Sequence, residues 1–455
     1  MSDPTALSAS AATRIADADH HVSSFVALRH AIGSAWALLV GITLLMLGTG
    51  LQGSLLGLRA NFEGFDTTTV GVVMSSYYLG YLLGSTQAPK LVATVGHIRV
   101  FAAFASIASS TVLLHALAVA PAGWVAFRVA SGFCMAGLFV VAESWLNDTA
   151  TNETRGSMLS LYGVVVSGGM GAGQLLLNLA DPSGFELFIL TSVLVSLALV
   201  PAALSVRSAP RFLQPTPVRL KTVFEAAPLG VVGAILSGAA SSAIFGVGVI
   251  YAQLRGLTLA ETATFMLVAI LGGAVLQWPI GWLSDHTDRR RIISAAAAVA
   301  AGLCVVGTMG PNGVVLLAVI GLLGGFSLPL YPLVNAHTND WIAHEQMVGA
   351  GSRLIMSSGM GAIGGPILAS TAMATIGAAG FFWFLAVVHV AVAVFAAWRI
   401  VVRPPRPVGE QTHFAPVPAR GSSVLVSAMY PEAYDEEDEP VFDTEEIPVV
   451  VIDDE

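Results

Sequence analysis

The sequence has few charged residues and few cysteines. Only 11% of its 455 residues are Asp, Glu, Lys or Arg, whereas a soluble domain carries about 25%. A chain of this length with so little charge cannot cover its surface with solvated groups, which argues against a large soluble protein. The two cysteines, Cys134 and Cys304, lie in apolar stretches, so neither a disulfide framework nor a cysteine metal site is expected.

Recognisable catalytic patterns are also absent from the sequence. It contains no Gly-x-x-x-x-Gly-Lys phosphate-binding stretch, which argues against ATP as an energy source. No His/Cys cluster has the spacing of a metal site. We therefore expect no enzyme activity, no cofactor, no metal and no nucleic-acid partner.

Long apolar runs dominate what is present, because 55% of the residues are hydrophobic. A membrane helix needs about 20 mainly apolar residues. Twelve runs meet this length approximately: 34–56, 68–89, 98–119, 122–146, 158–179, 185–206, 229–251, 260–282, 292–309, 313–334, 348–376 and 381–401. The predicted fold class is therefore an all-α membrane protein with twelve transmembrane helices, embedded in a lipid bilayer.

A polar, proline-containing segment divides these runs into six and six. The predicted organisation is a leader (1–33), an N-terminal six-helix bundle (34–206), a linker (207–228), a C-terminal six-helix bundle (229–401) and an acidic tail (402–455). The end of the tail, from Glu432 on, has twelve acidic and no basic residues. We expect this tail to be solvated and disordered.

The basic residues predict the orientation. With twelve spans, 17 of the 20 Lys and Arg residues fall on one side, two fall on the other, and Arg128 lies within a span. Cytoplasmic loops carry the excess of Lys and Arg. The sequence therefore predicts an inner (plasma) membrane protein with both termini in the cytoplasm, expected to be a monomer.

The two halves of the chain resemble each other. Three pairs of segments correspond, in order and at nearly one offset: 89–99 with 281–291, 143–147 with 331–335, and 169–172 with 359–362. A duplicated six-plus-six arrangement is typical of transporters whose halves rock around a central site. The pattern predicts two pseudo-symmetric bundles.

Several motifs resemble those of the major facilitator superfamily. The segment 281–291 has Gly281, then Ser-Asp after two residues, then Arg289, Arg290 and Arg291, as in that superfamily's cytoplasmic signature. Arg128 with Gly132 resembles its Arg-x-x-x-Gly element. The resemblance covers about residues 34–401 and implies a twelve-helix secondary transporter.

Other local stretches resemble the YcaD-like branch of this superfamily. They are 143–147 (Glu-Ser-Trp-Leu-Asn), 152–156, 277–281 and 331–333 together with His337. The chain departs from the superfamily pattern at Pro89 and Ala93, where glycine and aspartate are expected. It also lacks the proline that drug exporters of the superfamily carry in the fifth span.

Two charged residues within the fourth span are candidates for substrate binding or coupling. Arg128 either binds an anionic group or extends to the nearby membrane interface. Glu143 is about 22 Å farther along the helix. It is a protonatable coupling group, a gate acid paired with Arg155 or Arg353, or a solvated charge at the helix end.

Gly281, Asp285 and the three arginines 289–291 form the candidate cytoplasmic gate. The arginines alone are sufficient to set topology, whereas an acid beside them allows a latch that breaks and reforms. The further candidates for substrate or coupling are polar residues of inward-facing spans: Gln52, Tyr77, Asn147, Tyr331, Asn335, His337 and Arg353. Arg128 and Arg353 together favour an anionic or zwitterionic substrate.

The sequence thus predicts a secondary transporter of a small solute, working by alternating access as a symporter or antiporter with H⁺ as the expected coupling ion. The alternatives are a drug or metabolite exporter of the same fold, and a membrane sensor or scaffold that does not transport. The latch acid favours transport over a static scaffold. A drug exporter would carry an acid deep in the first span, and this chain has none there.

Overall fold

The computed structural model describes residues 33, 35–149, 154–204, 218–412 and 414. Nearly all of the predicted leader, the first half of the linker and most of the acidic tail lie outside these residues. Within the described part of the chain, every regular element is a helix. The prediction of an all-α fold is therefore confirmed.

The first helix is Ala35–Phe62. The elements that follow are α2 (Thr67–Val95), α3 (His97–Leu117), α4 (Pro121–Thr149), α5 (Arg155–Leu175), η1 (Leu176–Leu179), α6 (Glu186–Leu197), α7 (Leu199–Leu204), α8 (Leu220–Ala226), α9 (Pro228–Leu254), α10 (Leu259–Asp285), α11 (Arg289–Thr308), α12 (Gly313–Ser327), α13 (Leu330–Asn339), η2 (His344–Gln346), α14 (Met347–Ile376), α15 (Ala379–Val402) and η3 (Val408–Glu410).

Each of the twelve predicted spans corresponds to a helix or a helix pair. Ten helical segments of the described chain are long and apolar enough to cross a membrane. The two remaining spans are α2, which has 29 residues but is rich in Ser, Thr and Tyr, and α6, which continues into α7. The tenth span consists of α12 and α13.

The turns within the corresponding segments 89–99 and 281–291 are shorter than predicted. In the second half, α10 continues to Asp285 and α11 begins at Arg289, because Asp288 caps α11 by accepting a hydrogen bond from the Arg290 backbone N–H at 3.1 Å. In the first half, Gly96 alone separates α2 from α3. Its φ of 95° lies in a region that glycine adopts without steric cost.

Close helix packing repeats between the halves with an offset of 192 residues. In the first half, a Cβ on Gly80 would collide with the Val129 carbonyl, which locates the contact of α2 with α4. In the second half, a Cβ on Gly272 would collide with the Gly321 carbonyl, where α10 packs on α12. Small residues that let helix backbones approach are typical of membrane bundles. This repetition agrees with the predicted pseudo-symmetry.

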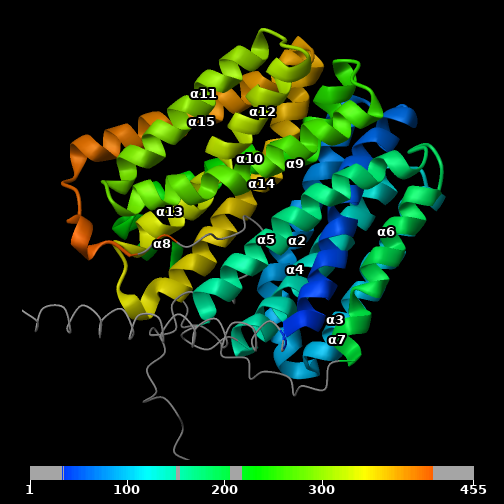
Figure 1. Ribbon diagram of the computed structural model, residues 1–455, viewed down its shortest axis with the longest axis horizontal. Helices are drawn as coiled ribbons and strands as arrows, with labels where there is room; N and C mark the ends of the chain where they lie inside the picture. Colours follow the sequence, from blue (N-terminus) through cyan, green and yellow to red (C-terminus); the bar gives the residue numbers. More distant parts are fainter. Residues whose placement is uncertain (1–32, 34, 150–153, 205–217, 413, 415–455) are drawn as a thin grey trace, which may run out of the picture.

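The two sets of helices meet at one end of the molecule. We call the end with the turn 286–288 the basic face, and the end with the turns 63–66 and 255–258 the far face. Toward the far face, the Ser75 hydroxyl of α2 donates to the Ile363 carbonyl of α14, and Gly57 of the first helix packs against Val249 of α9. In Figure 1 the two sets come together at the upper right and spread apart toward the lower left.

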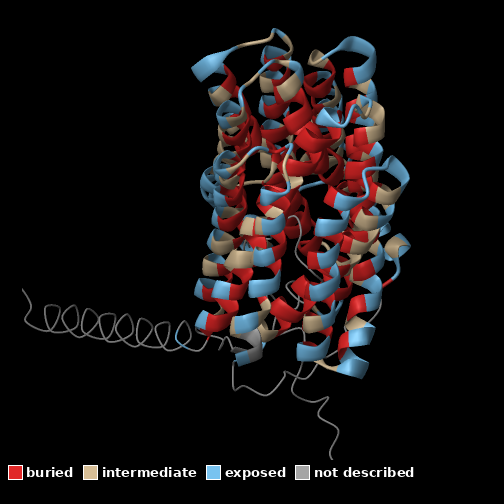
Figure 2. Ribbon diagram, turned by 90° about the vertical axis from the view of Figure 1, so that its right-hand side faces the viewer, coloured by how far each residue is buried: buried red, intermediate tan, exposed pale blue. Residues whose placement is uncertain are grey.

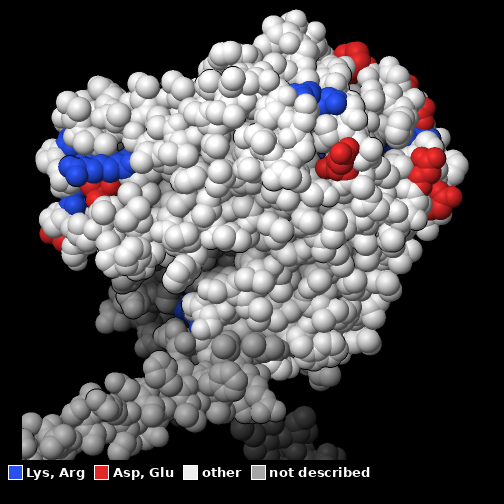
Figure 3. Space-filling view, turned by 45° about the horizontal axis from the view of Figure 1, so that its top comes forward, with Lys and Arg blue, Asp and Glu red and all other residues white. Residues whose placement is uncertain are grey.

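The surface between the two faces is apolar. Buried residues concentrate inside the bundle, whereas many perimeter positions are exposed (Figure 2). Large hydrophobic side chains such as Trp278, Val314 and Val275 are among the exposed ones. Charged side chains gather at the two ends of the view in Figure 3, with a broad, largely uncharged surface between them. This distribution suits a protein whose sides contact lipid.

Candidate functional site

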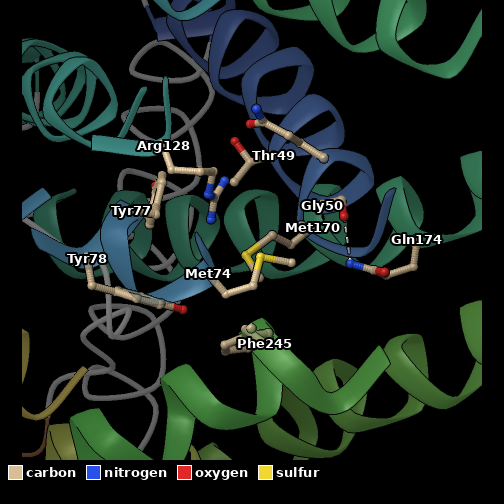
Figure 4. Close-up of a pocket in the computed structure, with 12 residues that line it drawn as sticks. Thr49, Gly50, Met74, Tyr77, Tyr78, Arg128, Met170, Gln174 and Phe245 are labelled. Carbon is tan, nitrogen blue, oxygen red and sulfur yellow. Dashed lines mark hydrogen bonds between the residues drawn. The ribbon is translucent and has the colours of Figure 1, made fainter. Parts of the chain in front are cut away.

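A central pocket lies between the first helix, α2, α4, α5 and α9. It contains about 430 Å³ of space that no atom fills, part of which is open to solvent. Its lining comprises Thr49, Gly50, Gln52, Gly53, Met74, Tyr77, Tyr78, Arg128, Met170, Gln174, Phe245 and Gly246. Five helices from both halves therefore build one site, and three of the predicted candidates, Gln52, Tyr77 and Arg128, line it. Figure 4 shows Tyr77 and Arg128 side by side among the lining residues.

Arg128 points into this pocket. Its side chain is 6% exposed, and its Cζ lies 4.5 Å from the centroid of the Tyr77 ring. Figure 4 shows the guanidinium beside Tyr77 and between Thr49 and Met74. A guanidinium over an aromatic ring is attracted to the ring face without using its N–H groups as donors to that ring. The placement therefore agrees with a binding site and not with extension to the membrane interface.

Two glutamines line the same pocket but differ in their hydrogen bonds. Gln174 is satisfied: its Nε2 donates to the Gly50 carbonyl at 2.8 Å, and its Oε1 accepts from the Ser54 hydroxyl at 2.5 Å. Gln52 is 7% exposed, and its Nε2 has no hydrogen-bond partner. A buried donor without a partner costs free energy. Gln174 therefore connects helices, whereas the Nε2 donor of Gln52 can bind an acceptor group of a ligand.

A second pocket of about 500 Å³ adjoins the first. It is lined by α2, α9 and α14: Tyr77, Tyr78, Tyr81, Ser241, Phe245, Ile355, Ser358, Gly359 and Ala362. Tyr77, Tyr78 and Phe245 line both pockets. The two pockets are thus adjacent parts of one region between the halves, with the polar groups concentrated in the first.

Glu143 is enclosed between α4 and α5. It has no exposed surface, and it accepts a hydrogen bond of 2.6 Å from the Tyr162 hydroxyl. The structure therefore contradicts the interpretation of Glu143 as a solvated charge at the helix end. The coupling and gate interpretations remain predictions.

The candidate gate residues form a network at the basic face. Arg289 is 1% exposed, and its Nη2 lies 2.8 Å from Asp285 Oδ1. Its Nη1 lies 3.7 Å from Oδ1 of Asp340, a residue at the end of α13 that is 3% exposed. Burial raises the pKa of Asp340, although Arg289 and hydrogen bonds from Thr412 act against this rise.

The segment after α15 completes this network. Asp285 Oδ1 accepts from the Phe414 backbone N–H at 2.9 Å, and the Thr412 carbonyl accepts from Arg289 Nη2 at 2.6 Å. Gly281 lets the Phe414 ring lie against α10, because a Cβ at this position would collide with the ring as it is placed. These contacts connect α10, α11 and α13 with the segment after α15, all within the second half. A latch between the two halves remains a prediction.

Arg290 and Arg291 differ from Arg289 in their surroundings. Arg290 is buried, pairs with Asp288 at 2.8 Å, and donates to the carbonyls of Arg399 at 3.0 Å and Arg403 at 2.7 Å. It therefore binds the C-terminal end of α15, where a cation is favourable. Arg291 is exposed, as expected of a residue that serves topology alone.

The remaining candidates lie away from the central pocket. Tyr331 and Asn335 are buried on α13, and the Tyr331 hydroxyl and Asn335 Oδ1 have no hydrogen-bond partner. His337 lines a small pocket at the basic face with Arg290 and Arg399. Arg353 donates from Nε to the Val218 carbonyl at 2.6 Å, and Asn147 is half-buried on α4.

Sequence reasoning missed several contributing residues. Met74, Met170 and Phe245 form the apolar side of the central pocket, but such residues in apolar runs carry no distinguishing signal. Asp340 had a usable signal, because Asp148 precedes it by the same 192-residue offset that relates the two turns. Among the described residues, no group of His, Cys, Asp and Glu has a metal-binding arrangement.

Comparison with known proteins identifies a family. The sequence profile described as Major Facilitator Superfamily matches residues 38–311 and 231–430. The chain is 28% identical over 339 residues to an uncharacterized MFS-type transporter of Enterobacter sp. (strain 638), covering 74% of this chain and 88% of that one. It is 26% identical over 334 residues to the uncharacterized MFS-type transporter YcaD of Escherichia fergusonii, covering 72% and 86%.

Solved structures show the same fold. A mutant form of the nucleoside transporter NupG superposes with a TM-score of 0.68 at 11% identity, covering 80% of this chain and 98% of that one. A bacterial homolog to the human lysosomal transporter Spinster, inward-facing and unoccupied, gives 0.64 at 14% identity and covers 90% and 98%. At such identities the likeness establishes the fold alone.

Proposed function

Because the chain belongs to the major facilitator superfamily, we propose that it is a secondary active transporter that moves a small solute by alternating access. One observation carries this proposal. The central pocket takes its lining from both sets of helices, which touch toward the far face and diverge toward the basic face (Figure 1). In the proposed cycle the bundles 34–206 and 229–401 move as units, joined by the linker 207–228.

The orientation in the membrane is part of the proposal. The excess of Lys and Arg supports a basic face in the cytoplasm, with both termini on that side of the inner membrane. Green fluorescent protein folds in the cytoplasm, whereas alkaline phosphatase requires the periplasm. A fusion of each after residue 455 should therefore give a fluorescent chain and an inactive phosphatase. The reverse pattern would overturn the orientation.

Protons are the proposed coupling ion, and Glu143 is the proposed carrier. Its complete burial and its bond to Tyr162 support this role, because an intramembrane carboxyl is costly and usually functional. A carboxyl that is protonated in one state and ionised in the other links proton movement to the rocking of the halves. The sense of transport, symport or antiport, follows from the sign of the gradient that drives uptake.

Flux through proteoliposomes tests this proposal. A thermal-shift screen of the purified protein against a metabolite library supplies the solute, and its uptake is measured with and without a pH gradient. Glu143→Gln should abolish uptake against a gradient but keep solute exchange, because exchange needs no net proton movement. Tyr162→Phe is the matched variant, which keeps the carboxyl and should retain coupling. Full accumulation by Glu143→Gln would refute the role of Glu143.

The gate has its own test. Asp285→Asn keeps the size of the side chain but removes the charge that faces Arg289, so transport should slow while expression stays normal. Asp66→Asn is a control, since Asp66 caps α2 near the far face through Thr69. Equal turnover of Asp285→Asn and the parent protein would leave the basic turn with a topological role alone.

A further inference from the structure

We propose that the central region binds an organic anion with an apolar body, such as an aryl or branched-chain carboxylate. This inference rests on the proposed transport function and names its substrate class. The negative end would accept hydrogen bonds from Arg128 and Gln52 in the first pocket. The apolar body would extend past Phe245 into the second pocket.

The charge of the lining sets the sign of the ligand. Among the described residues that line the two pockets, Arg128 alone carries a formal charge. It is buried where the interaction of charges is little screened by water. An arginine fork matches the two oxygens of a carboxylate. A cationic ligand would be repelled by this guanidinium.

The unsatisfied donor of Gln52 is an independent indication of a ligand. Its side chain is more than nine-tenths buried, it lines the same pocket as Arg128, and its Nε2 has no partner. Its neighbour Gln174 shows that the fold satisfies a glutamine in this pocket when the glutamine is structural. The guanidinium of Arg128 and the amide nitrogen of Gln52 are both hydrogen-bond donors, which suits an acceptor such as a carboxylate.

Apolar side chains make up much of the remaining lining, which favours a ligand with an apolar body. Met74, Met170 and Phe245 face the first pocket (Figure 4), and Ile355 and Ala362 line the second. Thr49, Ser241 and Ser358 supply a few hydroxyls, but a ligand with many hydroxyls would leave some of its own without partners, at a cost for each one. Methionines adapt to different apolar shapes. The body of the ligand is therefore apolar, and its outline is less restricted than the position of its charged end.

Equilibrium binding to the purified full-length protein in detergent tests the inference. The probe is radiolabelled benzoate, and the competitors are unlabelled benzoate, acetate, 2-naphthoate, the neutral isostere benzamide and the cation benzylamine. We expect benzoate and 2-naphthoate to compete about tenfold or more better than benzamide, the difference that a charge-assisted hydrogen bond supplies. Acetate should compete weakly, since it lacks the apolar body.

Variants connect this preference to the named residues. Arg128→Gln should remove the preference for benzoate over benzamide, and Gln52→Leu should weaken benzoate binding by about fivefold. Asn178→Ala, an exposed change on η1, is the control and should bind as the parent does. If Arg128→Gln does not fold, Gln52→Leu and the comparison of ligands on the parent protein still test the proposed ligand class.

The results separate this inference from the proposed function. Equal binding of benzamide or benzylamine, or no binding of any carboxylate at millimolar concentration, would overturn the ligand class. Binding needs no gradient and no movement of the halves. A protein that binds benzoate as expected but shows no flux in proteoliposomes would contradict transport and leave the ligand class intact.

Discussion

Replacing Arg289 with Met is expected to destabilise the second half strongly. Arg289 is enclosed by the turn of α10 and α11, by α13 and by the segment after α15, and it faces Asp285 and Asp340. Methionine keeps much of the length and apolar volume of the side chain but removes its charge. The buried carboxylate of Asp340 then loses its nearest cation.

The size of the loss follows from burial. Breaking a buried ion pair by removing one partner costs about 3–5 kcal/mol, because an uncompensated charge stays in a medium of low dielectric. Asp285 is 21% exposed and regains contact with water, whereas Asp340 is 3% exposed and does not. Most of the loss therefore comes from Asp340, and we expect about 3 kcal/mol, the lower end of this range.

Unfolding in mixed micelles, followed by the fluorescence of the eight tryptophans, measures this loss. Arg291→Met is the matched control, because Arg291 is exposed on the same helical turn and its loss should cost less than about 0.5 kcal/mol. Hydrogen exchange should also rise in the segment up to Phe414, since the Thr412 carbonyl loses its donor. Equal stabilities of the two variants would refute the reasoning.

A double variant isolates the pair. Arg289→Met with Asp340→Leu removes both buried charges, so it should be more stable than Arg289→Met alone. The two changes should therefore be non-additive by more than about 1 kcal/mol, as expected for residues in contact. Additive losses would mean that the 3.7 Å approach of Arg289 to Asp340 contributes nothing.

Two further predictions concern pH and helix packing. Because the pKa of Asp340 is raised, its contribution to stability is fully present below the ordinary value of 3.8 and is lost as pH rises through the folded-state pKa. Asp340→Asn should therefore flatten the pH dependence of the free energy of unfolding above pH 3.8. An unchanged slope would contradict this prediction. Gly80→Ala should lower the free energy of unfolding by about 1–3 kcal/mol, because its Cβ collides with the α4 backbone. The control is Gly163→Ala, whose Cβ meets nothing within 4 Å, and it should be neutral or stabilising by up to about 1 kcal/mol. Equal effects of the two variants would contradict the packing argument.

Much of the fold follows from the sequence because membrane helices have a strong and simple signal. The twelve apolar runs predicted each span, and the shared offset of three segment pairs predicted the duplication that the contacts of Gly80 and Gly272 repeat. The turns within 89–99 and 281–291 were predicted at the correct places, but they contain fewer residues than predicted. Capping residues such as Asp288 allow helices to continue into polar segments that composition alone predicts to be loops.

The central pocket was partly predictable for the same reason. Polar residues within apolar runs are conspicuous, and Gln52, Tyr77 and Arg128 were found in this way. Composition does not tell which polar residues share a pocket, and so His337 and Arg353 were grouped with them although they lie near the basic face or against Val218.

The sequence predicted only part of the network of candidate gate residues. Asp285 and Arg289 were visible because they are four residues apart. Asp340 and Phe414 reach the same place only through the packing of α13 and the return of the chain after α15. The repeat offers one comparison: His97 and Asp148 precede Arg289 and Asp340 by 192 residues, whereas Ala93 precedes Asp285.

Cross-linking the far face tests alternating access most directly. A Cβ on Gly57 would lie 3.8 Å from the Val249 Cβ, the usual separation in a disulfide, and neither residue lines the central pocket. Gly57→Cys with Val249→Cys should form a disulfide on mild oxidation. Solute flux through proteoliposomes should then stop and return on reduction, while each single variant transports under both conditions. Undiminished flux through fully cross-linked protein would contradict the proposal that the two halves separate at this face during transport.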